Sequence, residues 1–441
     1  MFAGLMGLLA YFVVLVAPLV LVLVFRTETH RNLVFELGKA FALSGIGIIA
    51  LQPWLASRYR FIERPYGLDM VLRFHKYMAV LALGLLVAHP VLLAVGEAGW
   101  ALFFSLDQAW YIYAGKLALT VFLVNGILSL YQERLGIKFE KWRNWHNVLA
   151  PATLVLAFLH SGFAADDVRY VPAMVAWWFL LPVAGALVFF HHRILVPRAK
   201  AKAPYIVSEV KEIAPKVWNV TMEPPEGRAV GDYLPGQFHF LTFFRGEGLP
   251  VEEHHWTISS SPTQKGFVAS TIKELGDFTS TMGKTRPGDK VAVEGPFGRF
   301  SYALHPREKN LAFIAGGIGV TPLMSMLRHM ADTRSDTRVT FLYANSDQEN
   351  IAFADELDAM HKAEYPRLSL VHVLSDPKQG WEGETGFIDK EKIRKYCKDQ
   401  LGDGVFYLCG PPGLVSAAVR SLKALGVEDD RIRLEIFTFL S

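Results

Sequence analysis

Residues 68–95 read LDMVLRFHKYMAVLALGLLVAHPVLLAV, an apolar run that contains two histidines, His75 and His89. A run of about 20 apolar residues is long enough to cross the hydrocarbon core of a membrane as a helix. Five further runs of similar length precede and follow it, at residues 2–25, 33–56, 111–131, 145–163 and 171–195. We therefore predict a membrane all-α domain, a six-helix bundle over residues 1–197, with no further span after it.

The composition agrees with a chain that is partly embedded in a membrane and partly soluble. Of the 441 residues, 51% are hydrophobic and 20% are charged, which disfavours a disordered protein. The formal net charge is only +3, so the charge gives no reason to expect nucleic acid as a partner. Two cysteines, Cys397 and Cys409, are too few for a disulfide framework or a four-cysteine metal site.

Basic residues in the loops predict the orientation of the six spans in the lipid bilayer. The segments after the second, fourth and sixth runs carry eleven Lys and Arg residues, whereas the alternate segments carry three. Loops rich in Lys and Arg stay on the cytoplasmic side. We therefore expect a multi-pass protein of the plasma (inner) membrane, with its N-terminus and everything after residue 197 in the cytoplasm.

Two of the six runs carry a matched pair of histidines. His75 and His89 are fourteen residues apart in the third run, and His146 and His160 are fourteen residues apart in the fifth. Fourteen residues make about four helical turns, so each pair lies nearly on one face of its helix, at two depths. Because the two runs cross in the same direction, His75 is level with His146, and His89 is level with His160.

Two imidazoles that face each other at one depth can bind a haem iron from both sides. We therefore predict two b-type haems, an inner one bound by His75 and His146 and an outer one bound by His89 and His160. A lone intramembrane histidine is more often a packed polar group, which is the alternative for each of the four residues. The repeated spacing on two parallel helices favours ligation.

Other polar residues of the spans have simpler explanations. Glu36 and Lys39 are expected to form an ion pair within the second span. Arg73 and Lys76 flank His75, and they either pair with haem propionates or extend to the membrane surface. Neighbouring His191 and His192, at the end of the sixth span, are expected to cap the helix or to face the lipid headgroups.

The rest of the chain predicts two soluble domains. Within residues 205–304, β-rich runs alternate with Gly and Pro turns, which is typical of a small antiparallel β-barrel. These runs lie at residues 205–223, 237–244, 255–260, 267–275 and 290–294. Within residues 305–441, strands alternate with helical stretches, which predicts a parallel sheet in an α/β domain. Its strands are expected at residues 311–315, 339–344, 368–374, 405–409 and 433–437.

The barrel carries candidate contacts to a flavin. PGQF at residues 235–238 precedes HHWTISS at residues 254–260, where a hydroxyl beside an aromatic ring can hydrogen-bond the edge of a flavin ring. IKELGDFT at residues 272–279 offers a turn and backbone donors for a pyrophosphate. The predicted FAD contacts are Pro235, Gln237, Phe238, His254, Trp256, Thr257, Ile258, Ser259, Ile272, Lys273, Gly276, Phe278 and Thr279.

Two glycine-rich turns of the α/β domain are candidate nucleotide sites. AGGIGVTP, residues 315–322, joins a strand to a helix, and its glycines allow a pyrophosphate to approach the helix N-terminus. LCGPPG, residues 408–413, places Cys409 at the carboxyl edge of the sheet, as either a catalytic thiol or an inert buried one. The predicted NAD(P)H contacts are Gly316, Gly317, Gly319, Val320, Thr321, Pro322, Asn345, Ser346, Cys409, Gly410, Pro411 and Pro412.

In this order, the paired histidines and the motifs HHWTISS, AGGIGVTP and LCGPPG resemble the ferric reductase/NADPH oxidase superfamily. Its members fuse a six-helix diheme domain to a ferredoxin–NADP reductase-like module that binds FAD and a nicotinamide, and the resemblance covers nearly the whole chain. His254, Trp256 and Thr257 match the usual His-Pro-Phe-Thr flavin motif, whereas His255 replaces its proline.

The resemblance also implies residues that no motif above contains. A C-terminal aromatic shields the flavin in this family, for which Phe437 is the candidate and Phe439 the alternative. Related oxidases place a cationic group beside the outer haem, for which His30 and Arg31 are candidates, with an interfacial anchor as their alternative role. Oxidases that prefer NADPH place an arginine where Asn345 stands, so NADH or weak discrimination between the two is expected.

The resemblance implies electron transfer from cytosolic NAD(P)H through FAD and two haems to an acceptor outside the cell membrane. Oxygen, reduced to superoxide, is the expected acceptor, because the predicted outer loops are short. A ferric or other metal-chelate reductase is one alternative, and an electron-transfer subunit that serves an extracytoplasmic protein is another. No obligatory regulatory subunit is expected, because neither a calcium-binding loop nor a Pro-rich docking tail is visible, so constitutive activity is predicted.

Overall fold

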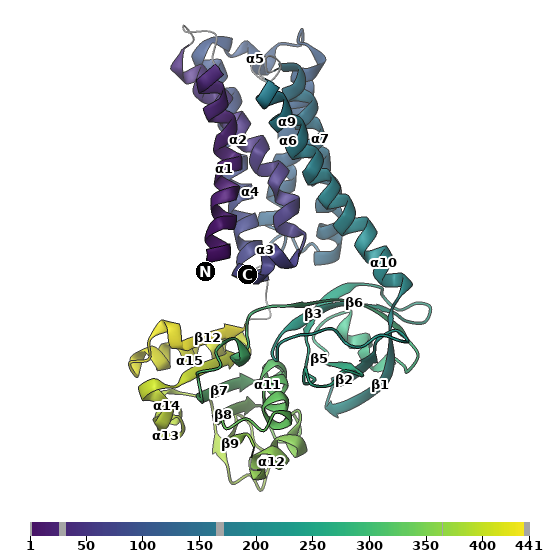
Figure 1. Ribbon diagram of the computed structural model, residues 1–441, viewed down its shortest axis with the longest axis vertical. Coiled ribbons are helices and arrows are strands. Elements are labelled where there is room, and N and C mark those ends of the chain that lie inside the picture. Colours follow the sequence, from purple (N-terminus) through teal and green to yellow (C-terminus); the bar gives the residue numbers. More distant parts are fainter. Residues whose placement is uncertain (1, 26–31, 165–171, 364, 436–441) are drawn as a thin grey trace. The chain divides into compact units, whose positions relative to one another are not determined.

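The computed structural model describes residues 2–25, 32–164, 172–363 and 365–435. The chain divides into two compact units, Met1–Val196 and Pro197–Ser441, and each is described by itself below (Figure 1). The predicted outer-site residues His30 and Arg31, the C-terminal aromatic Phe437 and its alternative Phe439 lie outside the described residues.

Among the described residues of the first unit, six helices are long and apolar enough to cross a membrane. The long helices are α1 (Phe2–Phe25), α2 (Leu33–Ala56), α4 (Leu68–Leu93), α6 (Trp110–Leu130), α7 (Phe139–Ala164) and α9 (Pro172–Phe190). Shorter segments are α3 (Arg60–Tyr66), η1 (Ala94–Ala98), α5 (Ala101–Phe104) and η2 (His191–Leu195). Helix α10 (Val196–Lys202) starts at the last residue of this unit and belongs mainly to the second. The six predicted apolar runs are therefore confirmed as helices.

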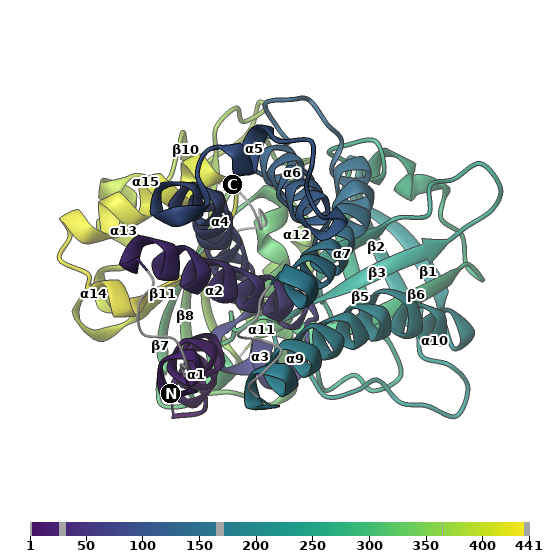
Figure 2. The ribbon, with the colours of Figure 1, turned by 90° about the horizontal axis from the view of Figure 1, so that it is seen from above.

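The helices of the first unit pack against one another as a bundle, which Figure 2 shows from above. Helix α4 lies along α2, which also contacts α1 and α9, and helix α7 lies along α6. By contrast, α4 and α7 make few or no direct backbone contacts with each other. The two helices that carry the paired histidines are thus held mainly by other helices.

The barrel of the second unit is a six-stranded antiparallel sheet with the order β4-β3-β6-β1-β2-β5. Its strands are β1 (Tyr205–Ala214), β2 (Val217–Glu223), β3 (Phe238–Phe244), β4 (Glu253–Thr257), β5 (Val268–Lys273) and β6 (Lys290–Phe297). A bridge between Ile258 and Ser270 connects the two edges of the sheet. The prediction of one run over residues 205–223 was wrong, because the chain turns at Pro215 and Lys216 and forms a hairpin.

The α/β part is a six-stranded parallel sheet with the order β10-β9-β8-β7-β11-β12. Its strands are β7 (Asn310–Gly316), β8 (Arg338–Asn345), β9 (Arg367–Leu374), β10 (Glu384–Thr385), β11 (Val405–Cys409) and β12 (Ile432–Glu435). Its helices are α11 (Val320–Asp332), α12 (Ala354–Lys362), α13 (Lys390–Tyr396), α14 (Lys398–Asp403) and α15 (Pro412–Ala424). The strand order reverses beside β7, and ligands bind at such a switch point.

Helix α11 joins the barrel to the parallel sheet. Ser325 donates a hydrogen bond from Oγ to the Ser260 carbonyl at 2.7 Å, and Arg328 donates to the Ser259 carbonyl at 2.6 Å. The same guanidinium also binds both carboxylate oxygens of Glu356, at 2.7 and 2.6 Å. Because a planar guanidinium with several partners has little freedom to rotate, these bonds hold the HHWTISS segment against the nucleotide-binding half of the unit.

A buried histidine lies inside the barrel. His239 on β3 is only 1% exposed, and its Nε2 lies 2.7 Å from Ser270 Oγ. Ser270 donates its hydroxyl hydrogen to the Thr257 carbonyl at 3.1 Å, so it accepts from a neutral His239 that carries its proton on Nε2. Burial lowers the pKa of His239 to about 3.

We expect the barrel to lose stability as the pH falls below about 6.5, the ordinary pKa of histidine. Between that value and the folded pKa of about 3, the unfolded chain binds the proton and the folded chain does not. Stability therefore decreases by at most about 1.4 kcal/mol per pH unit from this residue. Hydrogen exchange of β3 and β5 peptides in the full chain, corrected for intrinsic rates, measures the effect.

The matched variant is His239→Gln, which keeps a side-chain donor and does not titrate. It should protect these peptides less at neutral pH, but its stability should vary less with pH than that of the wild type. An identical pH dependence in both proteins would show that His239 is not the group responsible.

Candidate functional site

The structure brings the four predicted haem ligands together as two pairs. The imidazole centroids of His75 and His146 lie 6.3 Å apart, and those of His89 and His160 lie 6.5 Å apart. In both pairs one residue comes from α4 and the other from α7. The predicted pairing by depth is therefore the pairing observed in the fold.

The spacing within each pair fits a metal ion bound from both sides. A metal–imidazole bond is about 2.0–2.1 Å long, so two rings on opposite sides of one ion have centroids roughly 6 Å apart. The observed centroid distances of 6.3 and 6.5 Å are close to this value and too long for a direct hydrogen bond between the rings. Helices α4 and α7 also make few or no backbone contacts with each other. The two rings of each pair therefore face each other across the space between the two helices.

The second nitrogen of three of these rings is held by an acceptor on a neighbouring helix. Nδ1 of His89 lies 2.9 Å from the Gly38 carbonyl, and Nδ1 of His160 lies 2.8 Å from the Tyr111 carbonyl. Nδ1 of His146 lies 3.0 Å from Oδ1 of Asn125. Because each acceptor requires an N–H at Nδ1, the lone pair is on Nε2, the arrangement found in metal-binding histidines.

The fourth ring, His75, has a different environment. Its Nδ1 is buried beside the backbone of Gln52, but it has no hydrogen bond of regular geometry to any described residue. Both polar atoms of the Gln52 side chain are also buried without a partner among the described residues. Buried polar atoms without partners are rare, and they often mark the place of a missing ligand or water. The inner level therefore also fits a bound group.

Two contacts to the paired rings were not found by sequence reasoning. Asn125 is 5% exposed and lies in the otherwise apolar stretch VFLVNGILSL of α6, so a lone amide in a span was the available signal. Gly115 packs against His160, where an added Cβ would lie 2.7 Å from Nδ1. Glycine at this position allows α6 to come close enough for the Tyr111 carbonyl to reach the ring.

Two of the other polar pairs in the first unit are local ion pairs. The predicted ion pair between Glu36 and Lys39 is confirmed, at 3.7 Å. Arg73 pairs with Asp69 at 3.0 Å, and both side chains are exposed. Of the two roles predicted for His192, facing the lipid headgroups does not fit, because the residue is only 7% exposed within η2.

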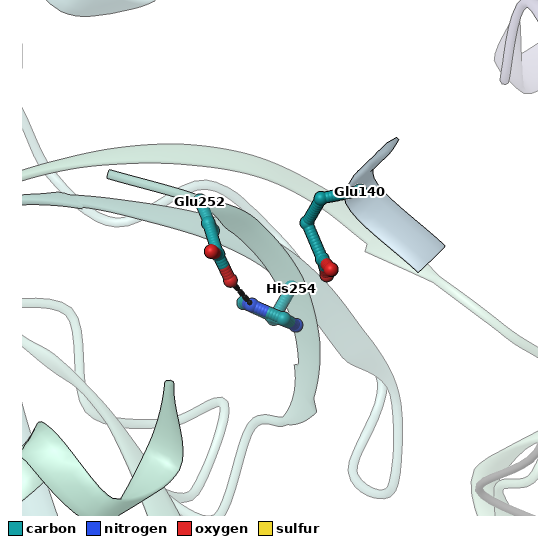
Figure 3. Close-up of side chains that lie close together, drawn as sticks. All are labelled: Glu140, Glu252 and His254. Atoms are coloured by element: carbon teal, nitrogen blue, oxygen red, sulfur yellow. Dashed lines mark hydrogen bonds and ion pairs between the residues drawn. The ribbon is translucent and has the colours of Figure 1, made fainter. Parts of the chain in front are cut away.

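An aromatic cluster marks the candidate flavin site of the barrel. The ring of His254 on β4 lies 5.5 Å from Trp256 and 4.4 Å from Phe278. His254 also donates from Nε2 to Glu252 at 3.0 Å (Figure 3). Arg245, which sequence reasoning missed, lies over Phe278 at 4.8 Å. The cluster combines flat apolar surface with polar groups, as recognition of a flavin requires.

Several predicted flavin contacts are already engaged in the barrel itself. The Gln237 amide accepts from the Leu234 N–H at 2.7 Å and donates to the Gly298 carbonyl at 2.8 Å, so it ties two turns together. Ser259 donates to the Ala269 carbonyl at 3.2 Å. The buried members of the predicted set are Pro235, Phe238, Thr257, Ile258, Ser259, Ile272 and Phe278, and those that reach the surface are Gln237, His254, Trp256, Lys273, Gly276 and Thr279.

The predicted pyrophosphate turn has its donors engaged as well. The Thr279 hydroxyl accepts from the backbone N–H of Leu275 at 2.8 Å and from that of Gly276 at 2.9 Å. Thr279 is also the first residue of the 3₁₀ helix η3 (Thr279–Lys284). Two backbone N–H groups of the turn at residues 272–279 are therefore already hydrogen-bonded within it. A pyrophosphate would have to displace the Thr279 hydroxyl to reach them.

The two glycine-rich turns meet at the carboxyl edge of the parallel sheet. The first, η5 (Gly317–Gly319), connects β7 to α11, and the second connects the neighbouring β11 to α15. An added Cβ on Gly319 would lie 2.3 Å from the Cys409 carbonyl oxygen, and one on Gly410 would lie 2.9 Å from the Gly316 nitrogen. These glycines allow the turns to touch, whereas Gly317, at φ +51°, has open space beside it.

The other predicted nucleotide contacts divide into buried and accessible residues. Buried members are Gly316, Gly319, Val320, Thr321, Pro322, Cys409 and Gly410, and members that reach the surface are Gly317, Asn345, Ser346, Pro411 and Pro412. The Cys409 side chain is fully buried, and this burial raises the pKa of its thiol well above the ordinary value. A thiolate nucleophile is therefore disfavoured at this position, and the description as an inert buried cysteine fits better.

The carboxyl end of β8 carries acidic rather than basic groups. Asp347 accepts from the Asn350 backbone and side chain, at 3.1 and 2.9 Å, and these hydrogen bonds lower the pKa of its carboxyl. Nearby Lys378 forms an ion pair with Glu349 at 2.5 Å. The Asn345 side-chain nitrogen is buried without a partner among the described residues. This edge offers a carboxylate where recognition of a 2′-phosphate would call for an arginine.

Three family comparisons account for most of the chain in sequence order. Residues 41–157 match the family described as "Ferric reductase like transmembrane component". Residues 204–302 match the oxidoreductase FAD-binding domain, and residues 313–420 match the oxidoreductase NAD-binding domain. The chain belongs to the ferric reductase/NADPH oxidase-like superfamily. The resemblance predicted for this superfamily member is thereby confirmed, as is its fold class of six apolar helices followed by a ferredoxin–NADP reductase-like module.

Two curated relatives each match less than half of this superfamily member. NADH-cytochrome b5 reductase 1 of Mycosarcoma maydis is 30% identical over 201 residues, 42% of this chain and 62% of the relative. A component of the Na(+)-translocating NADH-quinone reductase of Idiomarina loihiensis is 31% identical over 226 residues, 47% of this chain and 55% of the relative. The matched region thus spans less than two thirds of either relative.

A solved structure shows a likeness of fold alone. Flavohemoglobin from Malassezia yamatoensis, crystallised with FAD and heme, has a TM-score of 0.50 and 16% identity, covering 91% of this chain and 99% of that one.

Proposed function

We propose that this protein is a transmembrane NAD(P)H oxidase that passes electrons from cytosolic NAD(P)H, by way of FAD and two b-type haems, to extracytoplasmic oxygen, forming superoxide. The observation that carries the proposal is the pair of facing imidazoles at each of two depths, with centroids 6.3 and 6.5 Å apart. The FAD-binding and NAD-binding domains on the same chain supply a source of electrons for such a path.

Each bound group has a place among the residues of this chain. His75 and His146 would hold the inner haem iron through Nε2, and His89 and His160 would hold the outer one. The exposed part of the His254 and Trp256 cluster would contact FAD, and the turns at Gly317 and Pro411 would contact the nicotinamide nucleotide. Bound FAD takes two electrons as a hydride and releases them singly, and each haem carries one electron.

The orientation of the path follows from the basic loops, eleven Lys and Arg residues on one side against three on the other. This distribution supports a cytoplasmic second unit in a plasma (inner) membrane protein. The inner histidine pair then lies toward the electron donor, and the outer pair lies toward the acceptor. The protein residues orient the rings and keep their Nε2 atoms available for the iron. Because only electrons would cross the membrane, no proton-transfer catalyst is required there.

The nicotinamide is proposed to be NADH, or either nucleotide with weak discrimination. The Asp347 carboxylate that follows β8 would repel a 2′-phosphate, and the nearby Lys378 is already paired with Glu349. The two curated relatives described above are named as NADH enzymes, which agrees with this assignment.

A second candidate is a ferric or other metal-chelate reductase with the same electron path. The match of residues 41–157 to the ferric reductase-like transmembrane component favours it. Oxygen remains the first proposal because it is small enough to reach the outer histidine pair without a docking domain. An electron-transfer subunit that serves an extracytoplasmic protein is the third candidate, and no regulatory subunit is proposed.

The acceptor is identified by spectroscopy and oxygen uptake on the chain purified in detergent. We expect NADH to drive oxygen uptake, together with cytochrome c reduction that superoxide dismutase largely abolishes, because one-electron transfer to oxygen yields superoxide. The oxidised protein should show the absorbance of low-spin, bis-histidine haem. NADPH should support the same reaction at an equal or lower rate.

Other outcomes point to the other candidates. Reduced absorbance bands that persist in air but disappear on addition of a ferric chelate would select the metal reductase. Bands that persist with both acceptors would select the subunit that serves a protein partner. A preparation without haem, although supplied with it during expression, would contradict the whole transmembrane path.

A further inference from the structure

The two levels of the histidine pairs are held in different ways. At the outer level, both rings donate to backbone carbonyls, those of Gly38 and Tyr111. At the inner level, His146 meets a side chain, Oδ1 of Asn125 at 3.0 Å. His75 has no regular hydrogen bond at Nδ1 from any described residue. The inner pair therefore depends on one side-chain acceptor, which a substitution can remove without altering the backbone.

Asn125 is an unusual residue for its surroundings. It lies in the C-terminal half of α6 and is 5% exposed, with mostly apolar side chains around it in the sequence. A buried amide is unfavourable in an apolar environment unless it is hydrogen-bonded. Its amide oxygen points to the ring of His146, which also packs against Trp142 with a centroid distance of 5.4 Å. The position of the amide is thus explained by the imidazole and by nothing else in the apolar run.

We propose that Asn125 is a positioning residue for the inner pair, whose amide oxygen fixes the Nδ1–H tautomer of His146 and sets the electron affinity of the iron bound there. This inference rests on the proposed haem ligation. An acceptor on Nδ1–H makes the imidazole a stronger donor at Nε2, and a stronger donor favours the ferric over the ferrous state. Asn125 therefore holds the inner midpoint potential lower than it would otherwise be.

The test is a spectroelectrochemical titration of the full chain with its haems. Such a titration should show two reduction waves, one for the inner and one for the outer haem. Asn125→Leu keeps the approximate side-chain volume and removes the hydrogen-bond acceptor. The inner wave should therefore shift to a higher potential, and the outer wave should stay in place. Loss of such a partner typically weakens metal binding by about 10- to 100-fold, so haem should also leave the inner site faster. Asn125→Asp keeps an oxygen at the same place, and its inner wave should stay or move to a lower potential.

A matched control separates this role from general packing. Thr153 on α7 is 2% exposed, and its hydroxyl donates to the Leu149 carbonyl of its own helix at 2.9 Å. Thr153→Val removes a buried hydroxyl that bonds neither ring. Thr153 lies seven residues from both His146 and His160, on the same face of α7, so its replacement should shift neither wave selectively. The waves are assigned with His146→Ala and His160→Ala, which should each abolish a different wave.

The outcomes separate failure of this inference from failure of the proposed function. Wild-type protein with two haems, together with an unshifted inner wave in Asn125→Leu, overturns the role of Asn125 alone. Equal shifts of both waves also overturn it. If Asn125→Leu loses the inner haem, retention in Asn125→Asp supports the proposal, and loss from both variants overturns it in favour of packing. Wild-type protein without haem overturns the proposed function itself.

Discussion

Replacing His146 by alanine is expected to remove one of the two haems and to abolish electron transfer across the membrane. The ring is half of the inner pair, and its partner His75 would be left as the sole protein ligand. Because loss of the hydrogen-bond acceptor behind a ligand already weakens metal sites by about 10- to 100-fold, loss of the ligand itself should exceed that range. Haem per chain, measured after conversion to the pyridine complex, should fall by half.

The same variant separates the two units by function. Reduction of a water-soluble dye by NADH should persist, because the FAD-binding and NAD-binding domains lie after residue 203. His160→Ala should give the same loss of haem with a different spectral component removed. His191→Ala is the control, since this exposed residue bonds the Tyr59 hydroxyl at 2.8 Å and lies outside both pairs. Full haem content in both His146→Ala and His160→Ala would show that these two histidines are packed polar groups and not haem ligands.

Replacing Gly319 by alanine is expected to abolish NADH-dependent reduction of either acceptor or dye. The new Cβ would lie 2.3 Å from the Cys409 carbonyl oxygen and 2.7 Å from Gly410 Cα, both of them backbone atoms. Backbone atoms in a buried turn cannot rotate away, so β11 and η5 must separate, at a cost of about 1–3 kcal/mol or more. Separation misplaces both glycine-rich turns, and NADH titrations should show a large loss of affinity.

The control for this substitution is Gly402→Ala. Gly402 lies in α14, outside both glycine-rich turns, and an added Cβ would have no heavy atom within 4 Å. Alanine should therefore leave NADH binding intact and raise stability by about 0.5–1 kcal/mol, because it restricts the unfolded chain. Haem content should be normal in both variants. Wild-type affinity for NADH in Gly319→Ala would show that the crossing of the turns is not required for nucleotide binding.

The spans and the strands could be predicted from local patterns. A membrane helix requires an uninterrupted apolar run of sufficient length, and residues 68–95 satisfy that condition by themselves. The five strands predicted in the α/β domain were found because their apolar runs are bounded by polar turns, whereas β10 (Glu384–Thr385), only two residues long, was missed. One boundary was missed where Pro215 and Lys216 make a turn too short to interrupt the β-rich pattern of residues 205–223.

The candidate sites were predicted less completely than the elements that carry them. Gln237 and Thr279 were expected to contact the flavin, yet their polar atoms bind the turns of the barrel. Cys409 was placed correctly at the edge of the sheet, but its burial depends on the neighbouring turn at Gly319. The hydrogen bonds and the burial of such side chains depend on residues distant in the sequence, so no local sequence pattern indicates them.

The histidine pairs show which features the sequence determines and which depend on the tertiary structure. Sequence alone determined that His75 and His89 share one face of a helix, that His146 and His160 do the same, and that the pairs match in depth, because helical periodicity converts spacing into position. Only the tertiary structure decided that Asn125 hydrogen-bonds His146 and that Gly115 allows α6 to pack closely against His160. The physical reason is that spacing is a property of one helix, whereas the partner of Nδ1 depends on how a second helix is rotated and how closely it packs.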